Sequence, residues 1–233
     1  MQHLQVSHYK FPDREPLFRR SAKMFKRLVN NLAAQSNEYT IRYNPRRAYA
    51  FPLRGRERNM YSSLACAIDE ITPIHMSELP YERLTEDMAN AGRADFWCHH
   101  CNCHYVIELK RQPIGLSAKK STNVRNRWDA LQRQLDEVKD DFHKSVPDKA
   151  NAVRLGILVI PARSFKQDEI DWSIEESERL SKVIQEECGK SLTFMSIIKV
   201  PPRWWRYKRL TRWEYNPVIV VAGTYRGREH RLN

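Results

Sequence analysis

The sequence is poor in glycine and has no long apolar run, and each absence excludes a class of protein. Only 7 of its 233 residues are glycine, and neither an internal repeat nor a low-complexity tract is present. The composition is therefore that of a folded globular chain, not of a disordered or fibrous one. The longest apolar runs, at residues 155–160 and 218–222, are far shorter than a membrane span and are typical of buried strands.

A secretory signal and a disulfide framework are also absent from the pattern. Residues 1–10 lack the apolar segment of a signal peptide, and the 5 cysteines are an odd number. A cytoplasmic location is therefore expected. Hydrophobic residues make up 41% of the chain, which is enough for one substantial core with room for a small appended subdomain.

Basic residues are in clear excess. The chain has 40 Lys and Arg against 28 Asp and Glu, which gives a formal net charge of +12 at pH 7. A domain with this charge attracts polyanions. Nucleic acid is therefore the first expected partner, and an anionic membrane surface is the second.

Apolar spacing predicts an alternation of helices and strands. Helices are predicted at residues 16–35, 56–71, 124–142 and 168–188. Strands are predicted at residues 39–43, 48–53, 74–79, 153–161, 192–200 and 218–224, and a hairpin at 93–111. The helix between the hairpin and the buried strand at 153–161 implies a crossover, and therefore a mixed α/β sheet with helices on its faces.

The hairpin carries three charged residues whose register can be predicted. Glu108 and Lys110 are two residues apart on one strand, so both side chains leave the same sheet face. A tight turn at residues 101–102 would place Asp95 directly opposite Glu108, with Cβ atoms ~5 Å apart. A turn centred on residues 99–102 would leave the two carboxylates diagonal, at roughly 7–8 Å, still able to share an ion.

Two carboxylates that face each other beside a lysine suit a bound cation. Like charges this close raise one pKa or require a metal. Mg²⁺ is the natural occupant, because it is a hard ion that binds one or two carboxylates, water and phosphate oxygens. Such an ion would polarise a phosphate and help to generate hydroxide. Lys110 would orient or activate the attacking water and offset charge in the transition state.

The spacing of these residues resembles a known nuclease motif. Asp95, followed after twelve residues by Glu108-Leu-Lys110, is similar to the signature of the PD-(D/E)xK nuclease superfamily, which has the restriction-endonuclease-like fold. In that family an Asp begins one hairpin strand and (D/E)xK ends the next. A similar helix–strands–helix–strand order surrounds them here, over residues 56 to 160. Ala94 stands at the position of the motif's proline.

The resemblance implies both a fold and a reaction. It implies a restriction-endonuclease-like domain that hydrolyses phosphodiester bonds, most simply in DNA, with Mg²⁺ or Mn²⁺. Asp95 and Glu108 would bind the metal together with the Leu109 carbonyl. Lys110 would be the catalytic lysine.

A fourth acid is expected from the helix that precedes the sheet, because members of this superfamily often use one there. Glu57 lies on the apolar face of that helix, and a carboxylate turned toward a core needs a partner. Glu70 is the alternative, on the wetter side of the helix. Glu57 is also explained as an acid at a helix N-terminus, where the helix dipole favours negative charge.

A compact set of cysteine and histidine residues occupies the hairpin tip. Their types and a Cys-x-x-Cys spacing suit a structural Zn²⁺. The ligands would be Cys98, Cys101, Cys103 and His104. A second Cys-x-x-Cys or His-x-x-x-His pair is missing, and the alternative is a polar hairpin tip with buried thiols and no metal.

The C-terminal part interleaves cations with aromatic rings. Arginine and lysine can contact phosphates, and aromatic rings can stack on unpaired bases. We therefore expect nucleic-acid contacts from Arg203, Trp204, Trp205, Arg206, Lys208, Arg209 and Arg212. The alternative is a packing segment in which at least one Trp covers the core. The basic helix at residues 16–35 is a further candidate for contact with nucleic acid, a partner or a membrane surface.

Three parts of the chain are expected. They are a basic N-terminal helix and hairpin packed on the core (1–55), a PD-(D/E)xK-like nuclease core (56–200), and a basic aromatic C-terminal extension with a final strand (201–233). The expected function is a metal-dependent DNA endonuclease. The alternatives are a non-catalytic nucleic-acid-binding protein on the same fold and a zinc-stabilised binding or regulatory protein. A homodimer or a protein partner is compatible with cleavage of both DNA strands, although no coiled-coil pattern predicts a dimer.

Overall fold

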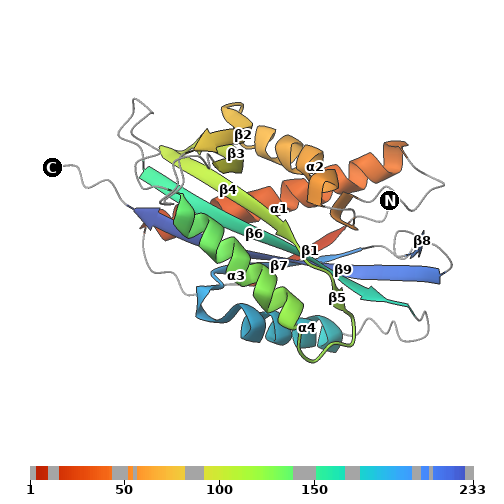
Figure 1. Ribbon diagram of the computed structural model, residues 1–233. Helices are drawn as coiled ribbons and strands as arrows, with labels where there is room; N and C mark the ends of the chain where they lie inside the picture. The colour runs from red at the N-terminus through yellow and green to blue at the C-terminus, as the bar shows by residue number, and fades with distance from the viewer. Residues whose placement is uncertain are drawn as a thin grey trace.

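Four α-helices and nine strands make up the described part of the chain (Figure 1). The computed structural model describes residues 4–9, 16–43, 52–54, 57–81, 92–138, 151–165, 174–200, 206–209 and 212–228. In chain order the elements are β1 (Gln5–Tyr9), α1 (Pro16–Tyr43), the 3-10 helix η2 (Pro52–Arg54), α2 (Glu57–Asp69), β2 (His75–Tyr81), β3 (Gly92–His100), β4 (Cys103–Arg111), β5 (Ile114–Gly115), α3 (Thr122–Glu137), β6 (Asn151–Ser164), α4 (Ile174–Cys188), the 3-10 helix η4 (Gly189–Ser191), β7 (Phe194–Lys199), β8 (Arg206–Arg209) and β9 (Arg212–Arg228).

The strands form one mixed sheet in the order β1-β7-β9-β6-β4-β3-β2, with β5 beside β6 and β8 beside β9. β4 and β6 run parallel, and α3 connects them as a crossover. The neighbouring pairs β3–β4, β6–β9, β7–β9 and β1–β7 are antiparallel. The predicted mixed α/β sheet with a strand–helix–strand crossover is therefore confirmed.

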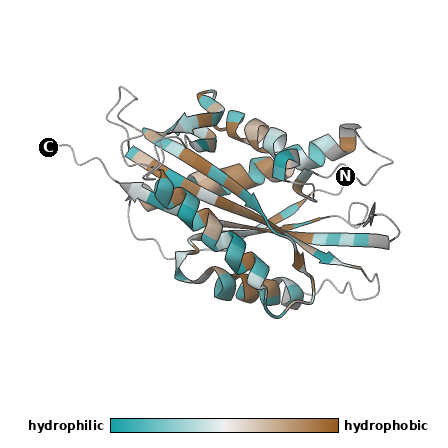
Figure 2. Cartoon of the chain, in the orientation of Figure 1, coloured by the Kyte–Doolittle hydropathy of each residue, from teal (hydrophilic) through white to brown (hydrophobic). Residues whose placement is uncertain are grey.

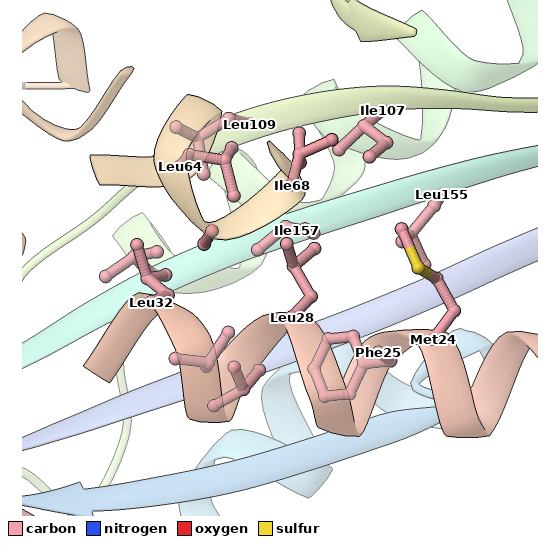
Figure 3. Close-up of a cluster of buried hydrophobic side chains, with 14 of the residues drawn as sticks. Met24, Phe25, Leu28, Leu32, Leu64, Ile68, Ile107, Leu109, Leu155 and Ile157 are labelled. Carbon is pink, nitrogen blue, oxygen red and sulfur yellow. The ribbon is translucent and has the colours of Figure 1, made fainter. Parts of the chain in front are cut away.

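Helices cover both faces of the sheet, and each face has its own apolar core (Figures 1 and 2). On one face, α1 and α2 pack on β4 and β6 through Met24, Phe25, Leu28, Leu32, Leu64, Ile68, Ile107, Leu109, Leu155 and Ile157 (Figure 3). On the other face, α3 and α4 pack on β6 and β9 through Trp128, Leu131, Leu180, Ile184, Leu158, Ile160 and Val220. β6 is buried on both sides, which explains its continuous apolar sequence.

The β3–β4 hairpin has the predicted tight turn. Cys101 and Asn102 have φ values of 51° and 57°, as a two-residue type I′ turn requires. The paired residues run from His100 with Cys103 to Phe96 with Ile107. The next position in this register sets Asp95 opposite Glu108, immediately beyond the last paired residues.

The prediction of an N-terminal hairpin within residues 1–55 is wrong. α1 continues as one helix through the predicted strand at residues 39–43. Ile41 packs against the same core as the earlier turns of α1, so tertiary packing outweighs the local β-propensity of its neighbours. Of the predicted strand at 48–53, residues 48–51 lie outside the described residues, and residues 52–54 form η2.

The final strand does not lie in an extension of the fold. β9 has 17 residues and lies between β6 and β7 in the middle of the sheet. Its residues 214–224 are buried, and successive side chains enter the two opposite cores. The expected C-terminal part at 201–233 therefore supplies a central strand of the main sheet. None of the described helices is both long and apolar enough to cross a membrane.

Candidate functional site

Asp95 lies where β3 separates from β4, and two other elements hold its carboxylate. Asp95 Oδ2 accepts a hydrogen bond of 2.7 Å from the backbone N–H of Leu109 on β4. Asp95 Oδ1 accepts a hydrogen bond from the Tyr61 hydroxyl on α2. In a continuous β3–β4 ladder the Leu109 N–H would bond to a backbone carbonyl of β3, and here the Asp95 carboxylate accepts that bond instead. The two contacts, one from β4 and one from α2, fix the orientation of the carboxylate.

Glu108 and Lys110 follow each other on one face of β4. Their neighbours Ile107 and Leu109 enter the core beneath α1 and α2, so alternation places Glu108 and Lys110 on the opposite face. Glu108 is fully buried, at 0% exposure. A buried carboxylate needs a cation or hydrogen bonds to match its charge.

Glu57, at the first turn of α2, joins the same cluster. Its Oε2 accepts hydrogen bonds from the Arg111 backbone N–H (3.1 Å) and from the Arg127 guanidinium (2.7 Å). Its Oε1 lies 3.9 Å from Lys110 Nζ. The rival acid Glu70 lies outside the cluster, since its Oε1 accepts a hydrogen bond from Gln35 on α1. Glu57 is therefore the acid that the preceding helix brings to Lys110, while its place in the first turn also suits the helix dipole.

Tyr61 is a site residue that the sequence did not single out. Its phenol pKa is raised above the usual value, chiefly by burial, then by the hydrogen bond to Asp95 and by the negative charges of Asp95, Glu57 and Glu108. Asp95 is the carboxylate in direct contact with this hydroxyl, whereas Glu57 and Glu108 act on it through their charge. The Tyr61 ring packs edge-on against Phe96 at 5.3 Å, which anchors it. Tyr61 lies four residues after Glu57 and hence on the same helix face, and this spacing is the signal that could have identified it.

Arg127 on α3 is the second residue that sequence reasoning missed. Its guanidinium pairs with Glu57 from the opposite layer of the fold. Nothing in the sequence near residue 127 relates it to the start of α2, because the contact depends on how α2, β4 and α3 meet at one end of the sheet. The charge of Glu57 is shared between Arg127 and Lys110, and Lys110 has the longer, looser contact.

The donor chemistry of the site fits a hard divalent cation. Asp95 and Glu108 supply carboxylate oxygens next to the Leu109 backbone, and oxygen donors of this kind suit Mg²⁺ or Mn²⁺. Within the described residues, no group of three or more Asp, Glu, His or Cys side chains is assembled for a metal. Two carboxylates can suffice for Mg²⁺, since that ion retains several of its waters.

The four residues expected to bind zinc do not converge. Cys98 and Cys103 are buried in the core beneath α1 and α2, and burial raises the pKa of the Cys98 thiol to about 12. His104 alternates to the opposite face, where its ring stacks on Trp97 (5.5 Å) and His99 (4.6 Å). Cys101 is exposed at the turn. A shared ion would need side chains from both faces of the sheet to meet, so this geometry does not support the zinc interpretation.

The basic aromatic segment is described only in part. Arg203, Trp204 and Trp205 lie outside the described residues. Arg206, Lys208, Arg209 and Arg212 lie on the β8–β9 ribbon, whose backbone is described without their side chains. Tyr215 pairs with both Arg206 on β8 and Ser164 at the end of β6. The ribbon therefore continues from the end of the sheet at which β6 and its parallel neighbour β4 finish, and Glu108 and Lys110 lie near that end of β4.

Comparisons with protein-family models, with curated proteins and with solved structures gave no match for this chain. The resemblance of Asp95, Glu108 and Lys110 to the PD-(D/E)xK signature has no support from similarity to whole proteins. What the chain does must therefore be inferred from the geometry and charge of its own residues.

Proposed function

We propose that this chain is a nuclease that hydrolyses phosphodiester bonds, most simply in DNA, with Mg²⁺ or Mn²⁺. The observation that carries the proposal is that Asp95, held by the Tyr61 hydroxyl and the Leu109 N–H, lies opposite Glu108 in the hairpin register, with Lys110 beside Glu57. Negative charge gathered in this way, in a chain of net charge +12, has a clear use if a divalent cation bridges the protein and a phosphate.

The arrangement of elements supports the same proposal. The order α2-β2-β3-β4-α3-β6 is the helix–strands–helix–strand order expected for the PD-(D/E)xK resemblance. Asp95 lies on β3 opposite the end of β4 that carries Glu108 and Lys110. On this proposal the domain is restriction-endonuclease-like, with β9, β7 and β1 extending the sheet.

Each side chain has a separate task in the proposed reaction. Asp95 and Glu108, with the Leu109 carbonyl, would hold the cation, which polarises a phosphate and lowers the pKa of bound water. Lys110 would orient the attacking water and offset developing negative charge. The 3.9 Å contact with Glu57 keeps the Lys110 ammonium nearby, while Arg127 takes the shorter contact with Glu57. Lys110 can therefore turn toward a phosphate without leaving Glu57 unmatched.

A second candidate is a nucleic-acid-binding protein without catalytic activity on the same fold. It is favoured by the contacts of Glu57, whose Oε2 already accepts hydrogen bonds from the Arg127 guanidinium and from the Arg111 N–H. In that case the acids join α2, β4 and α3 structurally, and the basic surface alone acts on nucleic acid.

A cleavage assay separates the two candidates. Supercoiled plasmid and a labelled RNA are incubated with the purified chain in Mg²⁺, Mn²⁺ or EDTA. Asp95→Asn and Lys110→Ala should each reduce the cleavage rate by about 10²-fold or more, because each removes a group that acts on the transition state. Glu186→Gln is the matched control. It removes one exposed negative charge from α4, far in the fold from β3, and should cleave as fast as wild type.

The nuclease proposal predicts two results in this assay. Cleavage must need the divalent cation, and it must be lost in both site variants while the control keeps it. A wild-type chain that binds nucleic acid but never cuts DNA or RNA in either metal would favour the second candidate. Equal cleavage by Asp95→Asn and wild type would show that the activity belongs elsewhere.

A further inference from the structure

A cavity of ≈190 Å³ lies between the first turns of α1 and the sheet edge formed by β1 and β7. Its floor is apolar: Phe18 and Phe25 of α1 pack on Phe194 of β7 at ring-centroid distances of 5.4 and 5.1 Å. These rings are nearly fully buried, so the floor is a rigid part of the core and not a loose surface flap.

The rim of this cavity is basic. Arg19, Lys23 and Lys26 line it and are exposed. Their spacing of four and three residues places them on one stripe of α1. No acidic side chain stands among the described residues that line the cavity, and the first acid in the sequence of α1 is Glu38.

This stripe is unfavourable for the helix that carries it. The N-terminus of a helix has a partial positive charge, so a cation in its first turn, such as Arg19, is destabilising. Like charges four residues apart, such as Arg19 and Lys23, repel one another as well. The neighbouring Arg27 has a structural use, since its guanidinium donates to the Glu70 carbonyl on α2. Within the described part of the chain, Lys23 and Lys26 make no hydrogen bond or ion pair of their own, and an anion at the rim would offset the repulsion along the stripe.

His8 holds one wall of the cavity in place through two hydrogen bonds. Its Nε2–H donates to Asn30 Oδ1 on α1 (3.0 Å), and its Nδ1 accepts from the Ser196 hydroxyl on β7 (2.7 Å). Burial and the nearby Lys26 lower the pKa of His8, which agrees with a neutral ring that serves both bonds. His8 therefore ties the edge strand β1 to α1 and fixes one wall of the cavity beside the basic rim.

We propose that this cavity and its rim bind a phosphate group of a nucleic-acid backbone, at a place separate from the carboxylate cluster. A volume of ≈190 Å³ is below the usual range for drug-sized ligands and suits one phosphate unit better than a whole nucleotide. A membrane surface fits less well, because the apolar side of α1 is buried in the core and a membrane-bound helix must expose that side. The choice of nucleic acid as the source of the phosphate rests on the proposed function.

The strand register relates this site to the carboxylate cluster. His8 is paired with Ser196, Ser196 with Val221, Val221 with Val159, and Val159 with Arg111 beside Lys110. The two sites thus lie at the same level of the sheet and are four strand spacings apart across it, or roughly 19 Å, with the cavity on the α1 face and Lys110 on the opposite face.

The test measures binding without cleavage. The triple variant Arg19→Gln/Lys23→Gln/Lys26→Gln is compared with the control Lys119→Gln/Lys182→Gln/Lys190→Gln. The control removes three exposed cations outside the rim and leaves the same net charge. Affinity for a fluorescein-labelled DNA duplex in EDTA is followed by anisotropy across a salt series. Each lost phosphate contact reduces the slope of log affinity against log salt by ~0.9, so the rim variant should lose about 1 unit of slope and at least about tenfold in affinity.

The outcomes keep this inference distinct from the nuclease proposal. The control should retain most of the slope, Asp95→Asn should retain all of it, and the rim variant should melt no lower than wild type. Equal slopes for the rim variant and the control would overturn the inference, whatever the cleavage assay shows. Loss of binding to phosphatidylserine vesicles in the rim variant, with duplex binding unchanged, would overturn it in favour of a membrane. A rim variant that binds duplex weakly beside a wild type that never cuts would retain the inference and reject the nuclease.

Discussion

The Asp95 carboxylate is held by groups that are remote from it in the sequence, one on α2 and one on β4. The Tyr61 hydroxyl donates a hydrogen bond to one carboxylate oxygen, and the Leu109 N–H donates one to the other. A carboxylate oxygen can accept more than one bond, so both oxygens can still face a cation. On the proposed function, fixing Asp95 in this way would lower the cost of ordering it when a metal binds.

Tyr61→Phe tests this positioning role. The change removes one hydroxyl and keeps the ring against Phe96. A hydrogen bond to a charged group contributes ~1.5–3 kcal/mol, so the Mg²⁺ concentration for half-maximal cleavage should rise roughly tenfold. Saturating Mg²⁺ should restore much of the rate. The control Tyr105→Phe removes a buried hydroxyl from the same hairpin and should leave the Mg²⁺ midpoint unchanged even if it lowers Tm. An unchanged midpoint in Tyr61→Phe would exclude the positioning role.

Among single residues, those on the hairpin could be predicted and those on facing helices could not. Asp95, Glu108 and Lys110 are related by strand alternation and by one turn, which are local properties. Glu57 could be proposed only as one of two acids. Tyr61 and Arg127 join the cluster through the packing of α2 and α3 against the sheet, and a single sequence holds no local sign of those contacts.

At the scale of elements, the β3–β4 turn sets the register on which the site depends. Cys101 and Asn102 both have positive φ, a region that suits Asn and Gly far better than Cys. The double change Cys101→Asn/Asn102→Gly gives the preferred type I′ sequence. It should stabilise the chain by ~1 kcal/mol, which corresponds to roughly 2–4 °C in Tm for a chain of this size.

The contrasting variant Cys101→Val checks the geometry of the turn directly. A β-branched residue is strained at positive φ, so its Tm should fall. If the Asn-Gly variant melted lower than wild type and the Val variant did not, the turn would lie elsewhere. The register that sets Asp95 opposite Glu108 would then be wrong.

Elements were predictable where their apolar pattern is strong and locally consistent. α2, the hairpin, α3 and β6 all show such patterns, and each was expected at nearly its observed place. The strand expected at 39–43 failed because the sequence there favours strand locally, while the apolar side of α1 continues along the core. β1 was missed because none of the side chains of this five-residue edge strand is buried, so its sequence has no apolar run to identify it.

On the scale of the whole molecule, two glycines let helices approach the centre of the sheet from opposite sides. A Cβ at Gly223 of β9 would overlap the ring of Phe25 on α1, and a Cβ at Gly156 of β6 would lie 2.8 Å from Leu135 on α3. The layers that carry the site are therefore packed closely through β6 and β9. The central place of β9 was not predictable, because its pairing with β6 and β7 joins segments far apart in the sequence.

Gly223→Ala tests this close packing. Overpacking a core typically costs ~1–3 kcal/mol, so Tm should fall by several degrees. Gly115→Ala is the matched control, since a Cβ there would meet Ala118 at an ordinary 3.8 Å, and its effect should stay within ~0.5 kcal/mol. Equal melting of the two variants would mean that α1 does not press on β9 as described.

The most direct test of the central claim is Mn²⁺ binding to the chain, followed by electron paramagnetic resonance. Wild type and the control Glu186→Gln should bind Mn²⁺ with the same affinity, and Mg²⁺ should compete for the site. Asp95→Asn and Glu108→Gln should each weaken binding at least about tenfold, because each removes one charged ligand of a hard cation. If both variants bind Mn²⁺ as tightly as the control, Asp95 and Glu108 do not form a metal site, and the proposed nuclease centre is wrong.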